Sequence, residues 1–274
     1  MKKNNIFNLF DLTGKNIVIT GASGTLGSQY ANTICQAGGN VILVDITNQN
    51  KILEKNLKKI YDTKIKSYTV DISNENHVKK LKNAVLNDFN DVYGLINNAA
   101  YTNVSAIKDS SKMHVGFEFF PKSLWDKMMA VNLNSVFYCC REFGSEMSSQ
   151  NNGVIVNIAS TYGLVGADQR IYGDTKINSP ASYAAAKGAI INLTRYLAAY
   201  WQGKNIRVNT LTPGGVEDKK YQKSSFIRNY SKKTILGRMA RKEEYNGAIL
   251  FLLSDASSYM TGSNLIIDGG WTAW

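Results

Sequence analysis

The chain has few of the residues that staple a fold, break it or bind metal. It holds 3 cysteines, 3 prolines and 2 histidines in 274 residues. An odd number of cysteines without a CxxC pair excludes a disulfide framework and a zinc motif. We therefore expect no metal site, a reducing cytoplasmic location, and core packing for Cys35, Cys139 and Cys140.

Long apolar runs are also missing. No stretch approaches the roughly 18 apolar residues of a membrane span. The start of the chain carries two lysines but lacks the apolar run of a secretory signal. The sequence thus predicts a protein that neither enters nor crosses a membrane.

Acidic residues are scarce relative to basic ones. There are 21 Asp and Glu against 32 Lys and Arg, which gives a formal net charge of +11. Such an excess raises the possibility of nucleic-acid binding. The lysines are scattered over predicted surface helices instead of alternating with aromatic residues, as a base-stacking platform would require. We interpret the charge as a solvated lysine surface and expect no nucleic-acid partner.

Hydrophobic residues make up 44% of the chain, enough for a full core. Short continuous runs of them indicate strands buried on both faces of a parallel sheet. These predicted strands are 17–19, 41–44, 65–70, 95–96, 154–156, 206–211 and 265–267. Helical periodicity separates them at 26–37, 51–61, 75–89, 124–147, 182–201 and 243–253. Strands and helices that alternate throughout, with no linker or repeat, predict one doubly wound α/β Rossmann domain over 1–274, a seven-stranded parallel sheet with helices on both faces.

A glycine-rich turn follows the first predicted strand. Gly21, Gly24 and Gly27 are spaced by three and lead directly into a helix. Glycine there lets the backbone approach a pyrophosphate at the helix N-terminus. Asp45 ends the next strand, where a carboxylate can accept both ribose hydroxyls and would repel a 2′-phosphate. The pattern favours NAD over NADP. A glycine turn and a solvated loop aspartate that bind no cofactor would give the same sequence pattern.

A second group of residues has acid/base character. Tyr183 and Lys187 are four apart on a predicted helix, so both side chains lie on one face. A nearby ammonium is expected to lower the pKa of a phenol, making it a better proton shuttle. Ser160 follows a predicted strand at the carboxyl edge, where its hydroxyl could hold a carbonyl oxygen. Tyr and Lys at this spacing are common on helix surfaces, so the argument depends on the whole group.

Together these residues resemble the short-chain dehydrogenase/reductase family from about residue 12 to residue 270. The matching motifs are the glycine turn, Asp71-Ile72, Asn97-Asn98-Ala99-Ala100, Asn132, Ser160, Tyr183 with Lys187, and Pro213-Gly214-Gly215. The resemblance implies that Tyr183 is the general acid/base, Lys187 lowers its pKa and holds the nicotinamide ribose, Ser160 orients the substrate, and Asn132 supports a proton relay. The implied NAD-binding set is Gly21, Ser23, Gly24, Thr25, Leu26, Gly27, Asp45, Asp71, Ile72, Asn98, Ala99, Tyr183, Lys187, Pro213, Gly214 and Val216.

The sequence departs from the family pattern in three places. Thr25 stands where the family usually has glycine, which leaves the phosphate geometry open. Two substrate-side insertions are expected, near 101–120 and 163–180, and the polar segment 216–235 is expected to be a mobile lid. The insertions hold Lys108, Asp109, Lys112, His114, Asp168, Arg170, Tyr172, Asp174 and Lys176. Arg170 is a candidate for binding a substrate carboxylate or phosphate through two guanidinium N–H groups. The alternative for each of these residues is a solvent-exposed loop position without a role in binding.

We therefore expect a NAD-dependent oxidoreductase that interconverts a secondary alcohol and a ketone on a polar, sugar-like or anionic small molecule. The alternative is a catalytically idle NAD-sensing or partner-binding protein on the same fold. The resemblance also implies a homotetramer or homodimer, and the C-terminal sequence is similar to family members from bacterial surface-sugar and flagellin-glycan pathways.

Overall fold

The computed structural model describes residues 5–102, 116–175 and 177–274. Seven parallel strands form one sheet in the order β3-β2-β1-β4-β5-β6-β7. Their bounds are β1 Asn16–Thr20, β2 Asn40–Asp45, β3 Ile65–Thr69, β4 Gly94–Asn97, β5 Gly153–Ile158, β6 Ile206–Pro213 and β7 Asn264–Ile267. The strand order reverses beside β1, which is where open α/β sheets bind ligands at the carboxyl edge.

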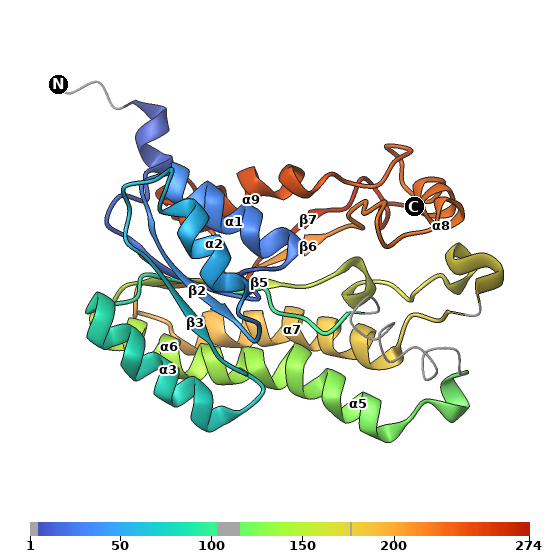
Figure 1. Cartoon of the computed structure of the whole chain (residues 1–274), viewed down its shortest axis with the longest axis horizontal. Coiled ribbons are helices and arrows are strands. Elements are labelled where there is room, and N and C mark those ends of the chain that lie inside the picture. Colours follow the sequence, from blue (N-terminus) through green and yellow to red (C-terminus); the bar gives the residue numbers. More distant parts are fainter. Residues whose placement is uncertain (1–4, 103–115, 176) are drawn as a thin grey trace.

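Helices cover both faces of the sheet (Figure 1). One face carries α1 (Thr25–Gln36), α2 (Gln49–Leu57) and α9 (Asn246–Leu253). The other carries α3 (Glu75–Phe89), α6 (Ser135–Gln150) and α7 (Ala181–Tyr200), with α5 (Lys122–Met129) leading into α6. Two buried clusters, one on each face, share the alternating side chains of the strands. The predicted Rossmann-like domain with a doubly covered parallel sheet is confirmed.

The predicted helix 124–147 is present, but its geometry changes in one turn. A π-helical turn, Ala130–Asn134, separates α5 from α6. Helical spacing of apolar residues continues on both sides of this one turn, so periodicity over the whole segment predicts a helix but not the type of each turn. Such turns are frequent at functional sites, and this one contains Asn132.

The segment 216–235, which is predicted to be a mobile lid, contains a helix, α8 (Ser224–Ser231). Tyr230 is buried there, and Phe226 and Ile227 pack against the same small cluster. Figure 1 shows α8 beside the C-terminus and far from the N-terminus. The role of 216–235 as a mobile lid stays a prediction, and the segment includes a short helix that the sequence did not predict.

Within the described ranges, none of the helices is long and apolar enough to span a membrane.

Candidate active site

The glycine turn between β1 and α1 is packed too tightly for side chains. Gly21 has a φ of +63°, and a Cβ on it would lie 2.8 Å from the Cα of Ala99. A Cβ on Gly27 would lie 2.2 Å from the carbonyl oxygen of Gly21. Gly24 caps α1, and the exposed Thr25 is the first helical residue. The turn therefore exposes backbone and the N-terminus of α1, which suits a pyrophosphate.

Two neighbouring strand ends are tied to this turn. Asn98 Nδ2 donates to the carbonyl oxygens of Thr20 and Gly21, at 3.0 and 3.1 Å. The Thr20 hydroxyl accepts from the backbone N–H groups of Asn98 and Ala99, at 3.0 and 3.1 Å. These bonds place the predicted residues Asn98 and Ala99 directly against Gly21.

Asp45 lies on the other side of the turn. Its Oδ2 accepts from the backbone N–H and the hydroxyl of Ser23, at 3.0 and 2.6 Å. Its Oδ1 accepts from the N–H of Thr47 at 3.1 Å. The carboxylate is thus held in one orientation at the end of β2, with its negative charge beside the place where the resemblance puts the adenosine ribose.

The remaining predicted cofactor residues lie at the same sheet edge. Asp71 Oδ1 accepts from the N–H and hydroxyl of Ser73 at 2.9 and 2.7 Å, and Ile72 is buried beside it. Pro213 ends β6, and Gly214 N–H donates to Ile267 at 2.8 Å. Leu26 and Val216 both pack against the core cluster on the α1 face. The edge therefore offers a cradle whose glycines, carboxylate and amide fit a dinucleotide such as NAD.

Ser160, Tyr183 and Lys187 come together at the end of β5. The Ser160 hydroxyl lies near enough to the Tyr183 phenol to lower its pKa. Lys187 Nζ donates to the carbonyl oxygen of Ile158 at 2.6 Å and lies 5.8 Å from the centre of the Tyr183 ring. Lys187 is only 2% exposed, whereas Tyr183 is partly buried against α5. One turn of α7 and one strand end thus assemble the predicted acid/base group.

The predicted electrostatics of this group need a correction. Burial raises the pKa of Tyr183, although the Ser160 hydroxyl opposes the rise. Burial also lowers the pKa of Lys187 to about 8. The net direction for the phenol is therefore opposite to the one expected from an ammonium neighbour, because the burial of Tyr183 dominates.

Asn132 is fully buried in the π-helical turn. Its side chain makes two bonds to one residue beyond β4: Oδ1 accepts from Tyr101 N–H at 2.6 Å, and Nδ2 donates to the Tyr101 carbonyl at 3.1 Å. In this arrangement the amide fixes the chain after Ala99 against the helix. A role in a proton relay stays a prediction.

We predicted that the Arg170 guanidinium binds a substrate anion, but its position in the structure is different. Its Nε and Nη2 donate to the two carboxylate oxygens of Asp168 at 2.8 and 2.9 Å, and its side chain is 83% exposed. Its guanidinium is therefore paired with a carboxylate of the same loop, and this placement gives the prediction no support. Lys108, Asp109, Lys112, His114 and Lys176 lie outside the described residues.

Sequence reasoning missed an aromatic group beside the acid/base residues. The rings of Tyr230 and Trp271 stack at 4.3 Å, and Tyr162 meets Trp271 edge-on at 6.4 Å. Gly215 N–H donates to the Tyr230 hydroxyl at 2.6 Å, which connects this group to the end of β6. Only the spacing of Phe226 and Tyr230 at one helical turn could have indicated it.

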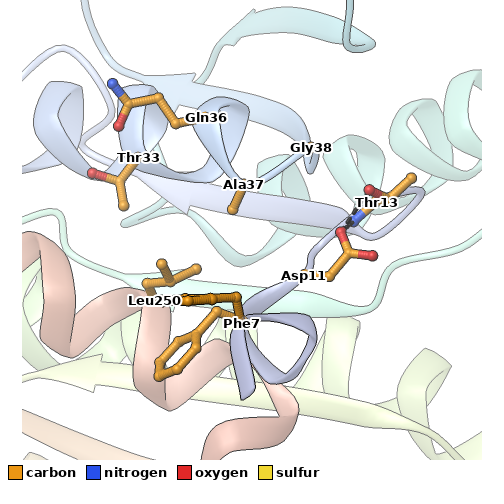
Figure 2. A pocket seen from close by; sticks show the side chains of 9 residues that line it. Phe7, Asp11, Thr13, Thr33, Gln36, Ala37, Gly38 and Leu250 are labelled. Atoms are coloured by element: carbon orange, nitrogen blue, oxygen red, sulfur yellow. Dashed lines mark hydrogen bonds between the residues drawn. The ribbon is translucent and has the colours of Figure 1, made fainter. Parts of the chain in front are cut away.

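A pocket of about 490 Å³ lies at the opposite, amino edge of the sheet. Figure 2 shows Phe7, Thr33, Gln36 and Leu250 around it. None of the predicted acid/base or cofactor residues lines it, so it is separate from the candidate site. The three cysteines are likewise buried and free, as expected for core residues.

No group of three or more His, Cys, Asp and Glu residues in the described part of the chain is arranged to hold a metal ion.

Comparisons with known proteins agree with this geometry. A family model described as enoyl-(acyl carrier protein) reductase matches residues 21–272. The chain is 33% identical to an NADP-dependent mannitol dehydrogenase from Hypocrea jecorina, over 98% of this chain and 96% of that protein. It is 32% identical to an NAD-dependent glycerol dehydrogenase from Listeria innocua, over 96% of each. A short-chain dehydrogenase from Leptospira borgpetersenii, solved with bound NAD⁺, has a TM-score of 0.82 at 31% identity and covers 99% of this chain and 97% of its own.

The fold and site define a Rossmann-type oxidoreductase that uses a nicotinamide dinucleotide and acts on CH–OH groups. The chain belongs to the short-chain dehydrogenase/reductase family. The relation to surface-sugar enzymes stays a prediction.

Proposed function

We propose that the protein is a NAD-dependent dehydrogenase that interconverts a secondary alcohol and a ketone on a polyol. The observation that carries this proposal is the assembly of Ser160, Tyr183 and Lys187 at the carboxyl edge of the sheet that presents the glycine turn. No observation supports the idle alternative, since every member of the predicted acid/base set is present.

The preference for NAD rests on Asp45. Ser23 and Thr47 hold its carboxylate at the end of β2, where it can accept from ribose hydroxyls and would repel a 2′-phosphate. The two reported relatives differ in cofactor, one being NADP-dependent and one NAD-dependent. The preference is thus a proposal about Asp45 in this chain.

In oxidation, Tyr183 acts as the phenolate and accepts the proton of the substrate hydroxyl to become a phenol, while the Ser160 hydroxyl holds the same oxygen. Bound NAD⁺ supplies the hydride acceptor for the hydrogen on the alcohol carbon. Lys187 Nζ lies 5.8 Å from the centre of the Tyr183 ring, where its positive charge favours the phenolate form that accepts the proton. In reduction, Tyr183 returns the proton to the oxygen.

A polyol is favoured over an anion by two observations. The relatives named above are a mannitol and a glycerol dehydrogenase. Arg170, the cation expected to bind an anion, pairs with Asp168 instead. We therefore propose a neutral, polyhydroxylated substrate, with 163–180 and 216–235 as the segments that face it.

The proposed chemistry is tested with Tyr183→Phe, which removes only the reacting hydroxyl. NADH absorbance is followed with a panel of polyols, and kcat is expected to fall roughly 10²-fold or more. Tyr259→Phe is the matched control, because Tyr259 is fully exposed. Undiminished turnover in Tyr183→Phe would reject the assignment.

We also propose a homo-oligomer in the cytoplasm. Tyr196 and Tyr200 stack at 6.1 Å on the outer face of α7 and are 62% and 68% exposed, and Phe137 on α6 is 47% exposed. Aromatic side chains of this kind are enriched at protein interfaces. Light scattering that returns the mass of a single chain would contradict the oligomer. The free, buried cysteines agree with a reducing compartment.

A further inference from the structure

The turn that follows β6 lies beside the reacting group. Leu211 of β6 pairs with Ile158 of β5, so the main chain beyond this pair leads to Ser160 on one strand and to the Gly214–Gly215 turn on the other. Asp45, the proposed partner of the adenosine ribose, ends β2, and β1, β4 and β5 lie between β2 and β6. A dinucleotide that crosses this edge with its adenosine at Asp45 therefore has its nicotinamide half beside the turn.

Two tyrosine hydroxyls bind the turn. The Tyr245 hydroxyl donates to the carbonyl oxygen of Gly214 at 3.0 Å, and the Tyr230 hydroxyl accepts from Gly215 N–H at 2.6 Å. That carbonyl and that N–H belong to the same planar peptide group. The two bonds therefore hold opposite sides of one peptide plane, and the plane cannot rotate without breaking both of them.

Both tyrosines are themselves held firmly. Tyr245 is fully buried at the end of the 3₁₀ turn Lys242–Tyr245, directly before α9. Tyr230 is buried on α8, and its ring stacks on Trp271 at 4.3 Å. A buried, packed ring has few other positions for its hydroxyl. The turn is thus bound from two separate elements of the fold, each with its own packing.

The close packing of the turn explains why it needs these two bonds. A Cβ on Gly214 would lie 2.8 Å from the Cα of Asp268, and a Cβ on Gly215 would lie 2.6 Å from Cζ of Tyr230. Both positions therefore require glycine. Since glycine has the greatest backbone freedom of all residues, a Gly–Gly peptide does not fix its own orientation. The two phenols supply the restraint that the glycines lack.

The orientation of this peptide affects the predicted cofactor residues on either side. The 214–215 peptide connects Pro213 with Val216, so its plane determines where the main-chain groups of both residues lie. A nicotinamide carboxamide has N–H donors and a carbonyl acceptor that need partners at fixed positions. If the turn adopted several orientations, the affinity would fall by the fraction of molecules in the binding orientation.

We propose that Tyr230 and Tyr245 are positioning residues for the nicotinamide half of the dinucleotide, because they hold the 214–215 peptide in the orientation that binds it. The inference rests on the proposed function. Each hydroxyl acts through its bond to the main chain, without contact with the cofactor or the substrate.

The test compares two ligands in Tyr230→Phe and in Tyr245→Phe. Each variant keeps the ring and loses one hydroxyl. Calorimetric titration gives the Kd of NAD and the Kd of ADP-ribose, which is NAD without its nicotinamide. We expect the Kd of NAD to rise roughly fivefold or more in each variant, as the loss of one hydrogen bond allows. The Kd of ADP-ribose should change less than about twofold, because ADP-ribose has no group that the turn positions.

Tyr93→Phe is the matched control. Tyr93 is buried, and its hydroxyl donates to the Leu253 carbonyl at 3.0 Å, the same kind of bond as that of Tyr245. It directly precedes β4 and so lies at the amino edge of the sheet, away from the turn. We expect both Kd values to stay within about twofold of wild type, even where the melting temperature falls as far as in Tyr245→Phe.

The outcomes separate this inference from the proposed function. Equal weakening of NAD and ADP-ribose in the two tyrosine variants, or no weakening of NAD, overturns the positioning role while the proposed dehydrogenase stands. A loss selective for NAD and of equal size in Tyr93→Phe overturns it as well, since any buried tyrosine would then have the same effect. Wild-type protein that does not bind NAD overturns both proposals.

Discussion

Lys187 should destabilise the fold at neutral pH. Its side chain is 2% exposed, and burial lowers its pKa from 10.5 to about 8. At about 1.36 kcal/mol per pKa unit, this corresponds to roughly 3 kcal/mol of destabilisation below pH 8. Lys187→Met removes the charge but leaves the Ile158 carbonyl without its 2.6 Å donor, which costs about 1–2 kcal/mol. We expect the variant to be inactive, yet more stable than wild type by roughly 1–2 kcal/mol at pH 7.

The pH dependence gives this prediction its sign. Between about pH 8 and 10.5 the unfolded chain binds a proton at Lys187 that the folded chain has lost, so the free energy of unfolding of the wild type rises relative to the variant. Urea denaturation at equal protein concentration, from pH 7 to 10, should show the advantage of the variant shrinking and then reversing.

Lys51→Met, which replaces an exposed lysine, is the control and should change the free energy of unfolding only slightly. A Lys187→Met variant that is less stable than wild type at pH 7, or a gap that stays constant across this range, would refute the reasoning.

Two further substitutions test the cofactor cradle. Asp45→Asn should weaken NAD binding roughly tenfold or more and reduce the preference for NAD over NADP, because a charged acceptor is lost. If fluorescence titrations gave an unchanged ratio of the NAD and NADP affinities, Asp45 would not determine the cofactor preference. Gly27→Ala would bring a methyl group within 2.2 Å of the Gly21 oxygen and should abolish NAD binding and lower the melting temperature. Gly247→Ala, at an exposed helical site with free space, should stabilise the fold by about 0.5–1 kcal/mol. Similar melting temperatures for the two glycine variants would contradict the crowding argument.

Local signals were sufficient for most elements of the fold. The helix Glu75–Phe89 has the predicted bounds, since the Asn74 side chain accepts from His77 N–H at its start and Asn90, with a φ of 69°, ends it. The parallel sheet was likewise indicated by apolar runs that are buried along their full length, such as β4 and β5. In these cases the residues that determine the structure are neighbours in the sequence.

The errors occur where distant contacts decide the structure. α8 has a short apolar face, and what buries Tyr230 is Trp271, which follows it by some forty residues. Asn132 in the π-helical turn makes two hydrogen bonds to the main chain of Tyr101, which is distant in the sequence. The pKa of Tyr183 is raised because the assembled fold buries its side chain, whereas the sequence indicates only the lysine one helical turn away.

The same distinction separates chemistry from specificity in this protein. Tyr183 and Lys187 are placed by a single helical turn, and Ser160 by the strand beside it, so their geometry depends on little else. The aromatic group beside it depends on long-range contacts, because Tyr172 packs on Phe226 of α8 and Tyr230 of α8 stacks on Trp271. Substitutions in those three segments should therefore leave the acid/base group in place. This is the arrangement expected when relatives on one fold act on different alcohols.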